Sequence, residues 1–280
     1  MHKQRQKYLT GKEMMAELHA CKMKKCSFVD DNDCSYHLIT STLKPNPEWA
    51  KASGLPRNLM IPTKEALDEI SEEQITNAME QHGITRDEVV VRVMTFDHVP
   101  MFEKVRRASY RTGMNHPTMS FPPFKHYRLR NGQWCEVLRS HWSGGIDNGH
   151  FDNETHISNK LAKMFLLLCE RISKKGNWVG YSYREEMVGT ALVNLMERGL
   201  NFNEAESNNP FAFYSTAINN SFIRVINEEA GVRRFRDDCL QDAGVAPSMT
   251  RQVENELARF DPNGTEPLKR SRGRPRKASK

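Results

Sequence analysis

Hydrophobic positions in the second half of the chain recur at the spacing of an α-helix. Between residues 156 and 173, one apolar stripe is formed by Ile157, Leu161, Met164, Phe165, Leu168 and Ile172. Residues 183–198 repeat the pattern, and a third segment with this spacing extends from Pro210 to about Glu229. Short polar connectors separate the three segments, which predicts a compact helical bundle over residues 151–243.

Local signals predict where these helices begin and end. Ser182 to Glu185 fits a capping box at the start of the 183–198 helix. Asn209 before Pro210 fits an N-cap followed by proline at the first helical position. Gly231 is expected to end the third helix.

The first half of the chain has weaker helical patterns. We expect helices over residues 8–25, from Thr63, and from Ser71, where a second capping box leads into a helix that ends at Gly83. Residues 26–62 contain four prolines and predict irregular structure.

Strand patterns follow in the middle of the chain. The β-branched residues of 88–94 predict a strand, and Asn131-Gly132 within residues 126–138 predicts a β-hairpin. The proline-containing segment from Gly113 to Lys125 is expected to be a loop. Beyond residue 244, prolines and polar residues predict a flexible segment.

The formal net charge of +6 is concentrated in the last residues. The bases there are Lys269, Arg270, Arg272, Arg274, Arg276, Lys277 and Lys280. The rest of the chain carries 34 basic against 35 acidic residues. This distribution is typical of a protein that contacts nucleic acid at one end and a mixed protein surface elsewhere.

Nothing in the pattern predicts a membrane or a secreted protein. The longest apolar stretch, Met164 to Cys169, is too short to cross a bilayer. The polar start, Met1 to Arg5, is followed by no apolar segment typical of a signal peptide. We therefore expect a cytoplasmic protein that does not contact membranes.

One group of side chains has the residue types of a zinc site. Cys21, Cys26, Cys34 and His37 are separated by four, seven and two residues, a spacing that matches no paired Cys-x2-Cys knuckle. Zinc and free thiols are both open interpretations; we favour free thiols and expect no metal or cofactor.

The third helix has a second, unusual face. Tyr214, Ile218, Phe222 and Val225 form its apolar stripe, whereas Phe213, Ala217, Asn220 and Arg224 line another side. Aromatic, amide and guanidinium groups stack on unpaired bases and contact base edges and phosphates. The alternative is that Phe211 and Phe213 pack under neighbouring helices.

Three ordered segments carry a resemblance to a known family. They are Asn177–Gly189 (NWVGYSYREEMVG), Leu200–Asn203 (LNFN) and Asn209–Phe213 (NPFAF). In this order they resemble the late-transcription sigma factors of T-even-type bacteriophages, with an aromatic-x-G-Y motif, an acidic helix start, an N-F-D-like loop and an N-P-x-A-aromatic motif. The match covers residues 155–243, and Tyr8 to Leu18 also resembles the first helix of the family.

The resemblance implies a fold and a set of domains. The family is distantly similar to the second conserved domain of bacterial sigma factors. We therefore expect a mainly α fold with a sigma-domain-2-like helical bundle in the C-terminal half. Residues 1–26 then supply the first helix, 27–150 an α+β insertion, 151–243 the sigma-like bundle, and 244–280 a disordered basic tail. The insertion is expected to bind a partner or to make an auxiliary DNA contact.

The resemblance also implies two partners, host core RNA polymerase and promoter DNA, in the cytoplasm of an infected bacterium. Helix 183–198 would dock on the clamp helices of the largest polymerase subunit through Glu185, Glu186, Val188, Gly189, Leu192 and Asn194. The next helix would open and recognise a TATA-like late promoter element. The residues implied there are Phe211, Phe213, Tyr214, Asn219, Asn220, Arg224, Asn227, Arg233, Arg234 and Arg236. No step requires a catalytic residue, so we expect no enzyme activity.

The sequence departs from the family at its end. The family ends in a hydrophobic-acidic motif that binds the sliding clamp, for which Leu257 to Phe260 is a poor substitute. Contacts with the clamp and with a phage co-activator remain implied by the resemblance alone. Where the family has its clamp-binding motif, this chain has a segment that resembles an AT-hook, formed by Arg272, Gly273, Arg274, Pro275 and Arg276. That motif inserts into the narrow A·T minor groove, and non-specific attraction to DNA is the alternative.

Two other classes of function remain open. A DNA-binding accessory or nucleoid-type protein for A·T-rich sequences explains the tail but leaves the acidic start of helix 183–198 without a role. A metal-dependent nuclease built from Asp147, His150 and Asp152 is the more remote alternative. The sequence contains no P-loop, G-x-G-x-x-G or H-E-x-x-H motif.

Overall fold

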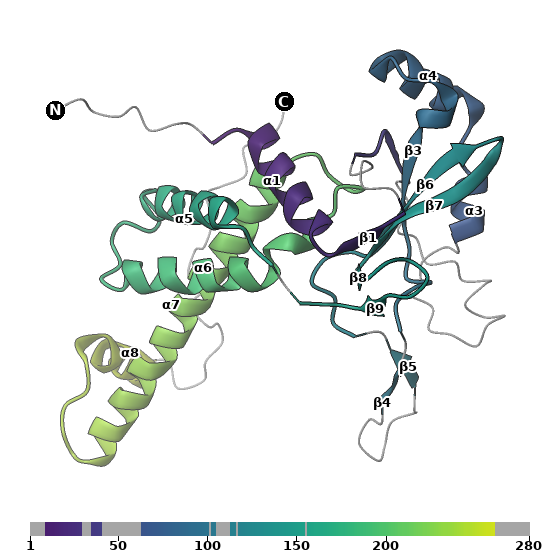
Figure 1. Cartoon of the computed structure of the whole chain (residues 1–280). Helices are drawn as coiled ribbons and strands as arrows, with labels where there is room; N and C mark the ends of the chain where they lie inside the picture. The colour runs from purple at the N-terminus through teal and green to yellow at the C-terminus, as the bar shows by residue number, and fades with distance from the viewer. Residues whose placement is uncertain are drawn as a thin grey trace. The chain divides into compact units, whose positions relative to one another are not determined.

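The computed structural model describes residues 9–29, 35–40, 63–100, 102–104, 113–115, 117–154 and 156–260. They divide into two compact units between Phe222 and Ile223. Figure 1 labels most of the helices and strands. The first unit contains a small mixed sheet and most of the helices, and the second contains two helical segments. The class of the fold, mainly helical with a small mixed sheet, agrees with the expectation from the sequence.

A five-stranded sheet lies in the first unit, with strand order β1-β7-β6-β3-β2. Its strands are β1 (Cys26–Phe28), β2 (Leu38–Ile39), β3 (Val90–Met94), β6 (Phe124–Arg130) and β7 (Gln133–Ser140). Neighbouring strands are antiparallel except β2 and β3, which are parallel. Two small hairpins accompany it, one of β4 (Phe102–Lys104) and β5 (Gly113–Asn115), the other of β8 (Trp142–Ser143) and β9 (His150–Phe151).

The predicted hairpin of β6 and β7 is confirmed. Asn131 and Gly132 form its turn with φ values of 50° and 76°. Both values lie in the left-handed region, which Asn and Gly tolerate better than other residues. This turn connects the central strand β6 to its neighbour β7.

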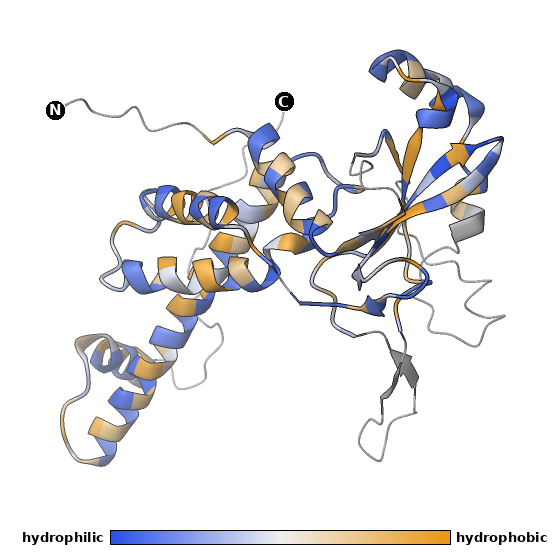
Figure 2. Cartoon of the chain, in the orientation of Figure 1, coloured by the Kyte–Doolittle hydropathy of each residue, from blue (hydrophilic) through white to orange (hydrophobic). Residues whose placement is uncertain are grey.

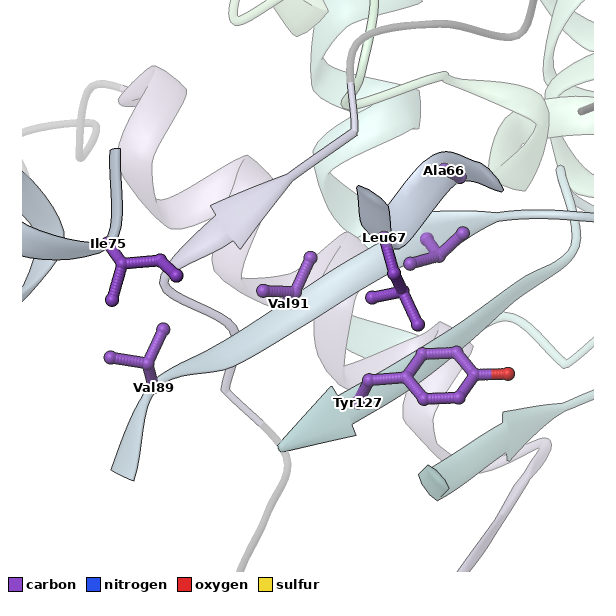
Figure 3. Packing of buried hydrophobic residues seen from close by; sticks show 7 residues of the cluster. Ala66, Leu67, Ile75, Val89, Val91 and Tyr127 are labelled. Carbon is purple, nitrogen blue, oxygen red and sulfur yellow. The ribbon is translucent and has the colours of Figure 1, made fainter. Parts of the chain in front are cut away.

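Two helices cover part of this sheet. The predicted starts at Thr63 and Ser71 are confirmed by α3 (Thr63–Asp68) and α4 (Glu72–His82). Ser71 forms a complete capping box, and Gly83 ends α4 with φ 65°. Figure 3 shows the core cluster that joins these helices to β3 and β6: Ala66, Leu67, Ile75, Val89, Val91, Val93 and Tyr127.

Two expectations about this region are wrong. Residues 26–62 were expected to be irregular but contain β1 and β2, and the expected loop from Gly113 to Lys125 contains β5 and the start of β6. β1, β2 and β5 have only two or three residues and thus show no alternation of apolar and polar positions. β1 and β2 form by pairing with the longer strands β7 and β3, and β5 forms by pairing with β4, which local sequence does not encode.

A helical bundle forms the other part of the first unit. Its elements are α1 (Gly11–Met23), α5 (Asn159–Ser173), α6 (Arg184–Arg198), the 3-10 turn η2 (Gly199–Asn201) and α7 (Pro210–Asp242) up to Phe222. α1 packs against α5 and η2, although well over a hundred residues separate α1 from them in the chain. Orange and blue residues alternate along these helices in Figure 2, as expected for helices that bury one face.

Three expectations about the helices of the second half of the chain need correction. α7 does not stop at Gly231 but continues to Asp242, and the expected flexible segment after residue 244 contains α8 (Met249–Phe260). One interior glycine costs a helix only about 1 kcal/mol, and good helix formers surround Gly231. The capping box from Ser182 to Glu185 is absent, since Tyr183 is the N-cap and makes no side-chain capping bond.

A buried ion-pair cluster joins the sheet to the bundle within the first unit. Glu204, in the loop after η2, pairs with Lys22 of α1 at 3.2 Å and also with Arg92 of β3. Lys22 Nζ donates a second hydrogen bond, of 2.8 Å, to the carbonyl of Phe202. All three charged side chains are at most 4% exposed. Burial raises the pKa of Glu204, but the charges of Lys22 and Arg92 outweigh it, so the net pKa lies below its usual value.

Aromatic rings complete the surroundings of Arg92. Its guanidinium carbon lies 4.0 Å from the ring centroids of both Tyr36 and Phe124. Arg92 Nε donates to His126 Nε2 at 2.9 Å, and Nη2 lies 3.1 Å from His19 Nδ1. These contacts keep the cation solvated by protein groups in place of water.

A second buried polar site lies around His141. The residue adopts φ 54°, and its Nε2 lies 3.1 Å from Ser120 Oγ. Its ring centroid is 3.8 Å from that of Phe121. Burial, with a smaller contribution from His98, lowers the pKa of His141 to about 3.

We predict that Glu204→Gln destabilises the protein by about 3–5 kcal/mol, because it leaves the charges of Lys22 and Arg92 buried without a counter-charge. Chemical denaturation measures the free energy of unfolding. Glu73→Gln, on the exposed side of α4, is the control and should change it by less than about 0.5 kcal/mol. Equal stability of the two variants would contradict the role given to Glu204.

We predict that acid destabilises the protein in part through His141. Its folded pKa of about 3 lies below its unfolded value, so the folded state favours the neutral imidazole. The resulting contribution of His141 to the free energy of unfolding is fully present above about pH 6.5 and is lost as pH falls. At pH 5 this loss amounts to about 2 kcal/mol. His141→Asn suits the positive φ and removes the titration. Its free energy of unfolding should therefore fall less between pH 7 and pH 5 than that of the wild type; equal falls would refute the assignment.

Candidate polymerase and nucleic-acid interfaces

The first turn of α6 presents carboxylates to solvent. Glu185 and Glu186 are both exposed at the start of the helix, where acidic groups are favoured by the helix dipole. Gly189 is exposed one turn later, and Val193 follows on the same side with 57% of its surface exposed. The opposite side of α6 buries Met187, Ala191 and Leu195. The outer face therefore combines negative charge with apolar surface.

The other expected polymerase contacts are less exposed to solvent. Val188 and Leu192 are half-buried. Asn194 is also half-buried, and its side-chain nitrogen donates a 3.0 Å hydrogen bond to Ser221 Oγ of α7. Asn194 thus connects α6 to α7. Val193, which the sequence reasoning missed, is better placed for an outside contact, and its position seven residues after Glu186 is the signal that identifies it.

The expected apolar stripe of α7 is confirmed. Tyr214, Ile218 and Phe222 are fully buried in the first unit, and Val225 is buried as well. The hydroxyl of Tyr214 donates a 2.5 Å hydrogen bond to the carbonyl of Gly199, and burial raises its pKa. Tyr214 was expected to capture an unpaired base, but its ring lies in the core and offers no free surface to a base.

The two neighbouring phenylalanines differ in exposure. Phe211 is half-buried, and its ring lies 3.7 Å from the position that a Cβ on Gly11 would occupy at the start of α1. Phe213 is 39% exposed, while its inner edge packs against Phe202 and Tyr214. Of the three expected aromatic contacts, Phe213 is therefore the one with an open ring surface.

An exposed face runs along α7 from Phe213. Thr216 and Asn220 follow at three- and four-residue spacing and are exposed, whereas Asn219 is half-buried. Aromatic, hydroxyl and amide groups thus succeed one another along the helix.

The arginines of α7 are exposed. Arg233, Arg234 and Arg236 were expected just past a helix that ends at Gly231, but they lie within α7, which continues to Asp242. Arg224 is paired with Glu228 at 3.0 Å. Arg233 Nε donates to the carbonyl of Glu229 at 3.4 Å, and Arg236 approaches Asp237 at 3.5 Å. Arg234 is exposed and makes no hydrogen bond or ion pair within residues 156–260.

The segments that resemble the phage family mostly build the framework around these faces. Trp178 packs edge-on against Phe222, and Phe202 packs against Phe213 and Tyr214. Asn209 Oδ1 accepts the backbone N–H of Ala212 at 3.2 Å, which confirms the expected N-cap of α7. These contacts fix the position of the first half of α7 within the bundle.

The residues of the less favoured zinc interpretation that the structure describes have other partners. Cys21 Sγ accepts from the backbone N–H of Ser158, and Cys26 Sγ donates to the carbonyl of Lys22. His37 Nδ1 accepts from the backbone N–H of Val90 at 3.0 Å. Cys34 lies outside the described residues. Among those residues, no group of three His, Cys, Asp or Glu side chains is arranged to hold a metal ion.

The three residues of the remote nuclease alternative do not form a metal-binding group either. Asp147 and His150 are exposed, whereas Asp152 pairs with Lys25 at 2.7 Å and accepts a hydrogen bond from Ser143. The AT-hook-like residues 272–276 lie outside the described part of the chain.

Comparisons with known proteins give no further identification: no protein-family model, curated protein or solved structure matches the chain. Among the helices that the structure describes, none has the length and apolar character needed to cross a bilayer.

Proposed function

We propose that this protein is a sigma-type transcription initiation factor of a bacteriophage, which binds host core RNA polymerase and opens a TATA-like promoter element. The observation that carries the proposal is the pair of unlike exposed faces on α6 and α7. α6 offers Glu185, Glu186 and Val193, and α7 offers Phe213 and Asn220. An initiation factor needs a polymerase surface and a DNA surface of these two kinds.

The α6 face suits a protein partner. Its exposed carboxylates favour a basic partner surface, and Val193 adds an apolar contact that can be desolvated in a complex. Duplex DNA repels such a surface, because each phosphate carries a negative charge. The resemblance of this segment to the phage family supports the polymerase clamp helices as the partner.

The α7 face suits unpaired bases. The exposed ring of Phe213 stacks on a base, and the amide of Asn220 hydrogen-bonds to a base edge. Opening and unstacking a base costs a few kcal/mol, and stacking on an aromatic side chain returns about 1–3 kcal/mol. The protein then acts by coupling the cost of opening the DNA to the free energy gained when it stacks on the opened bases, with no covalent step.

A DNA-binding accessory protein for A·T-rich sequences is the second candidate. The basic residues after Leu268 favour it, since they attract DNA without any need for polymerase. The two candidates differ in whether the α6 face has a partner.

We predict that Glu185→Lys/Glu186→Lys abolishes binding to bacterial core RNA polymerase, because it reverses the charge of the proposed polymerase surface. Purified full-length protein and core enzyme are mixed, and the complex is measured by pull-down. Glu73→Lys/Glu80→Lys is the matched control, with two exposed acids of α4 reversed, and should bind like the wild type. If the wild type fails to bind core but still binds A·T-rich duplex, the proposal is replaced by the accessory-protein alternative.

We predict that Phe213→Ala reduces open-complex formation about 5- to 100-fold on an A·T-rich, TATA-containing template, because one stacking platform is lost. Permanganate reactivity of unpaired thymines measures the opening, and core binding should stay unchanged. Tyr214→Phe is the matched control: it removes the buried hydrogen bond to Gly199 and lowers stability, but leaves opening intact where the protein is folded. The assignment fails if Phe213→Ala opens the template like the wild type.

A further inference from the structure

The second unit contains a pocket that the sequence reasoning did not identify. It lies between the C-terminal half of α7 and α8 and has a volume of about 280 Å³. Arg233, Arg234 and Arg236 from α7 line it together with Arg251 from α8. The hydroxyl-bearing Ser248 and Thr250 lie at its other side, at the start of α8.

A buried carboxylate holds the two sides of this pocket together. Asp237 is 5% exposed, and its two oxygens accept hydrogen bonds from the backbone N–H of Ser248 at 3.1 Å and from its hydroxyl at 2.6 Å. The hydrogen bond from the Ser248 side chain is the main reason why the pKa of Asp237 is lowered. Arg251 adds a second connection, to Asp238 of α7, at 2.8 Å. The start of α8 is therefore fixed beside the arginines.

The charge of the lining is positive on balance. Asp237 and Glu254 are its acidic members, against the four arginines. Asp237 is already engaged with Ser248, and Glu254 lies 3.9 Å from Arg251. Arg234 makes no hydrogen bond or ion pair within residues 156–260, and Arg233 donates only to a helix carbonyl. These two guanidinium groups are available to an anion.

The combination of groups fits a phosphodiester. Guanidinium groups bind phosphate oxygens through paired N–H donors, and the hydroxyl of Thr250 and the free N–H groups at the start of α8 add further donors. The hydroxyl and the backbone N–H of Ser248 already donate to Asp237. The pocket is at the small end of ligand sites, large enough for a phosphate group and part of a sugar but not for a whole dinucleotide.

An exposed aromatic ring on the same helix favours a single strand over other phosphate carriers. Phe235 lies between Arg234 and Arg236 in the sequence, is 71% exposed and stands outside the lining of the pocket, where a base next to the bound phosphate can reach it. Single-stranded nucleic acid is bound by basic groups that follow the backbone and by aromatic rings on which bases stack. An acidic peptide offers no planar base for this ring.

We propose that the arginine pocket between α7 and α8 binds a backbone phosphate of single-stranded nucleic acid, with Phe235 stacking on an adjacent base. The inference deepens the proposed function by adding a contact for an opened strand. Its test contains no polymerase, so the two proposals fail separately.

Binding of a fluorescent single-stranded oligonucleotide to the full-length protein is measured by anisotropy at several salt concentrations. Arg233→Ala/Arg234→Ala should lower the slope of log affinity against log salt by about 0.7, since the two arginines hold one phosphate and each phosphate contact on a single strand contributes about 0.7. Phe235→Ala should weaken binding about 5- to 100-fold at an unchanged slope, because stacking releases no counterions. Lys174→Ala/Lys175→Ala removes two exposed charges of the first unit and should leave the slope unchanged. The basic residues after Leu268 are the same in all four proteins.

Hydrogen exchange locates the contact. The oligonucleotide should slow exchange of the amides in the first turn of α8 in the wild type and not in Arg233→Ala/Arg234→Ala. An unchanged salt slope in the arginine variant, or no protection at α8, overturns the proposal. Protection by inorganic phosphate or by an acidic peptide, with none from the oligonucleotide, overturns the assignment to nucleic acid.

Discussion

The buried carboxylate of Glu204 is the contact on which the first unit depends. It pairs with Lys22 of the first helix and Arg92 of the sheet, so three distant parts of the chain meet at one charge. Each of these ions is expensive to bury, and removal of one leaves the others uncompensated. Phe202, whose carbonyl also binds Lys22, packs against Phe213 and Tyr214 of α7. The geometry of the proposed DNA face therefore rests on the same cluster.

Local signals predicted much of the fold. The capping box at Ser71, the turn at Asn131-Gly132 and the N-cap at Asn209 appear as expected, because each depends on a few adjacent residues. Short strands such as β2 arise from pairing with distant residues, so no local sequence pattern predicts them. The continuation of α7 through Gly231 was missed, because one glycine is a weak helix terminator when good helix formers surround it.

The candidate site was predictable in outline and not in detail. Helical periodicity separated the buried stripe of α7 from its outer face, but it did not show that Tyr214 belongs wholly to the core. Asn194 looked like a surface amide, yet it bonds to Ser221 of the neighbouring helix. The arginine pocket depends on Ser248 and Arg251 folding back onto α7, which requires a helix that the sequence did not predict.

The distant pairing of Lys22 also bears on how the chain is made. During synthesis, 182 residues must be added before Glu204 follows Lys22 out of the ribosome. At about 5–20 residues per second this takes roughly 10–35 s. Until α5 and then η2 have been synthesised in that interval, Met14, Leu18 and Cys21 of α1 lack the helices that pack against α1 in the finished protein. The nascent chain therefore exposes an apolar helix face for many seconds, which makes it a natural client for chaperones that hold unfinished proteins.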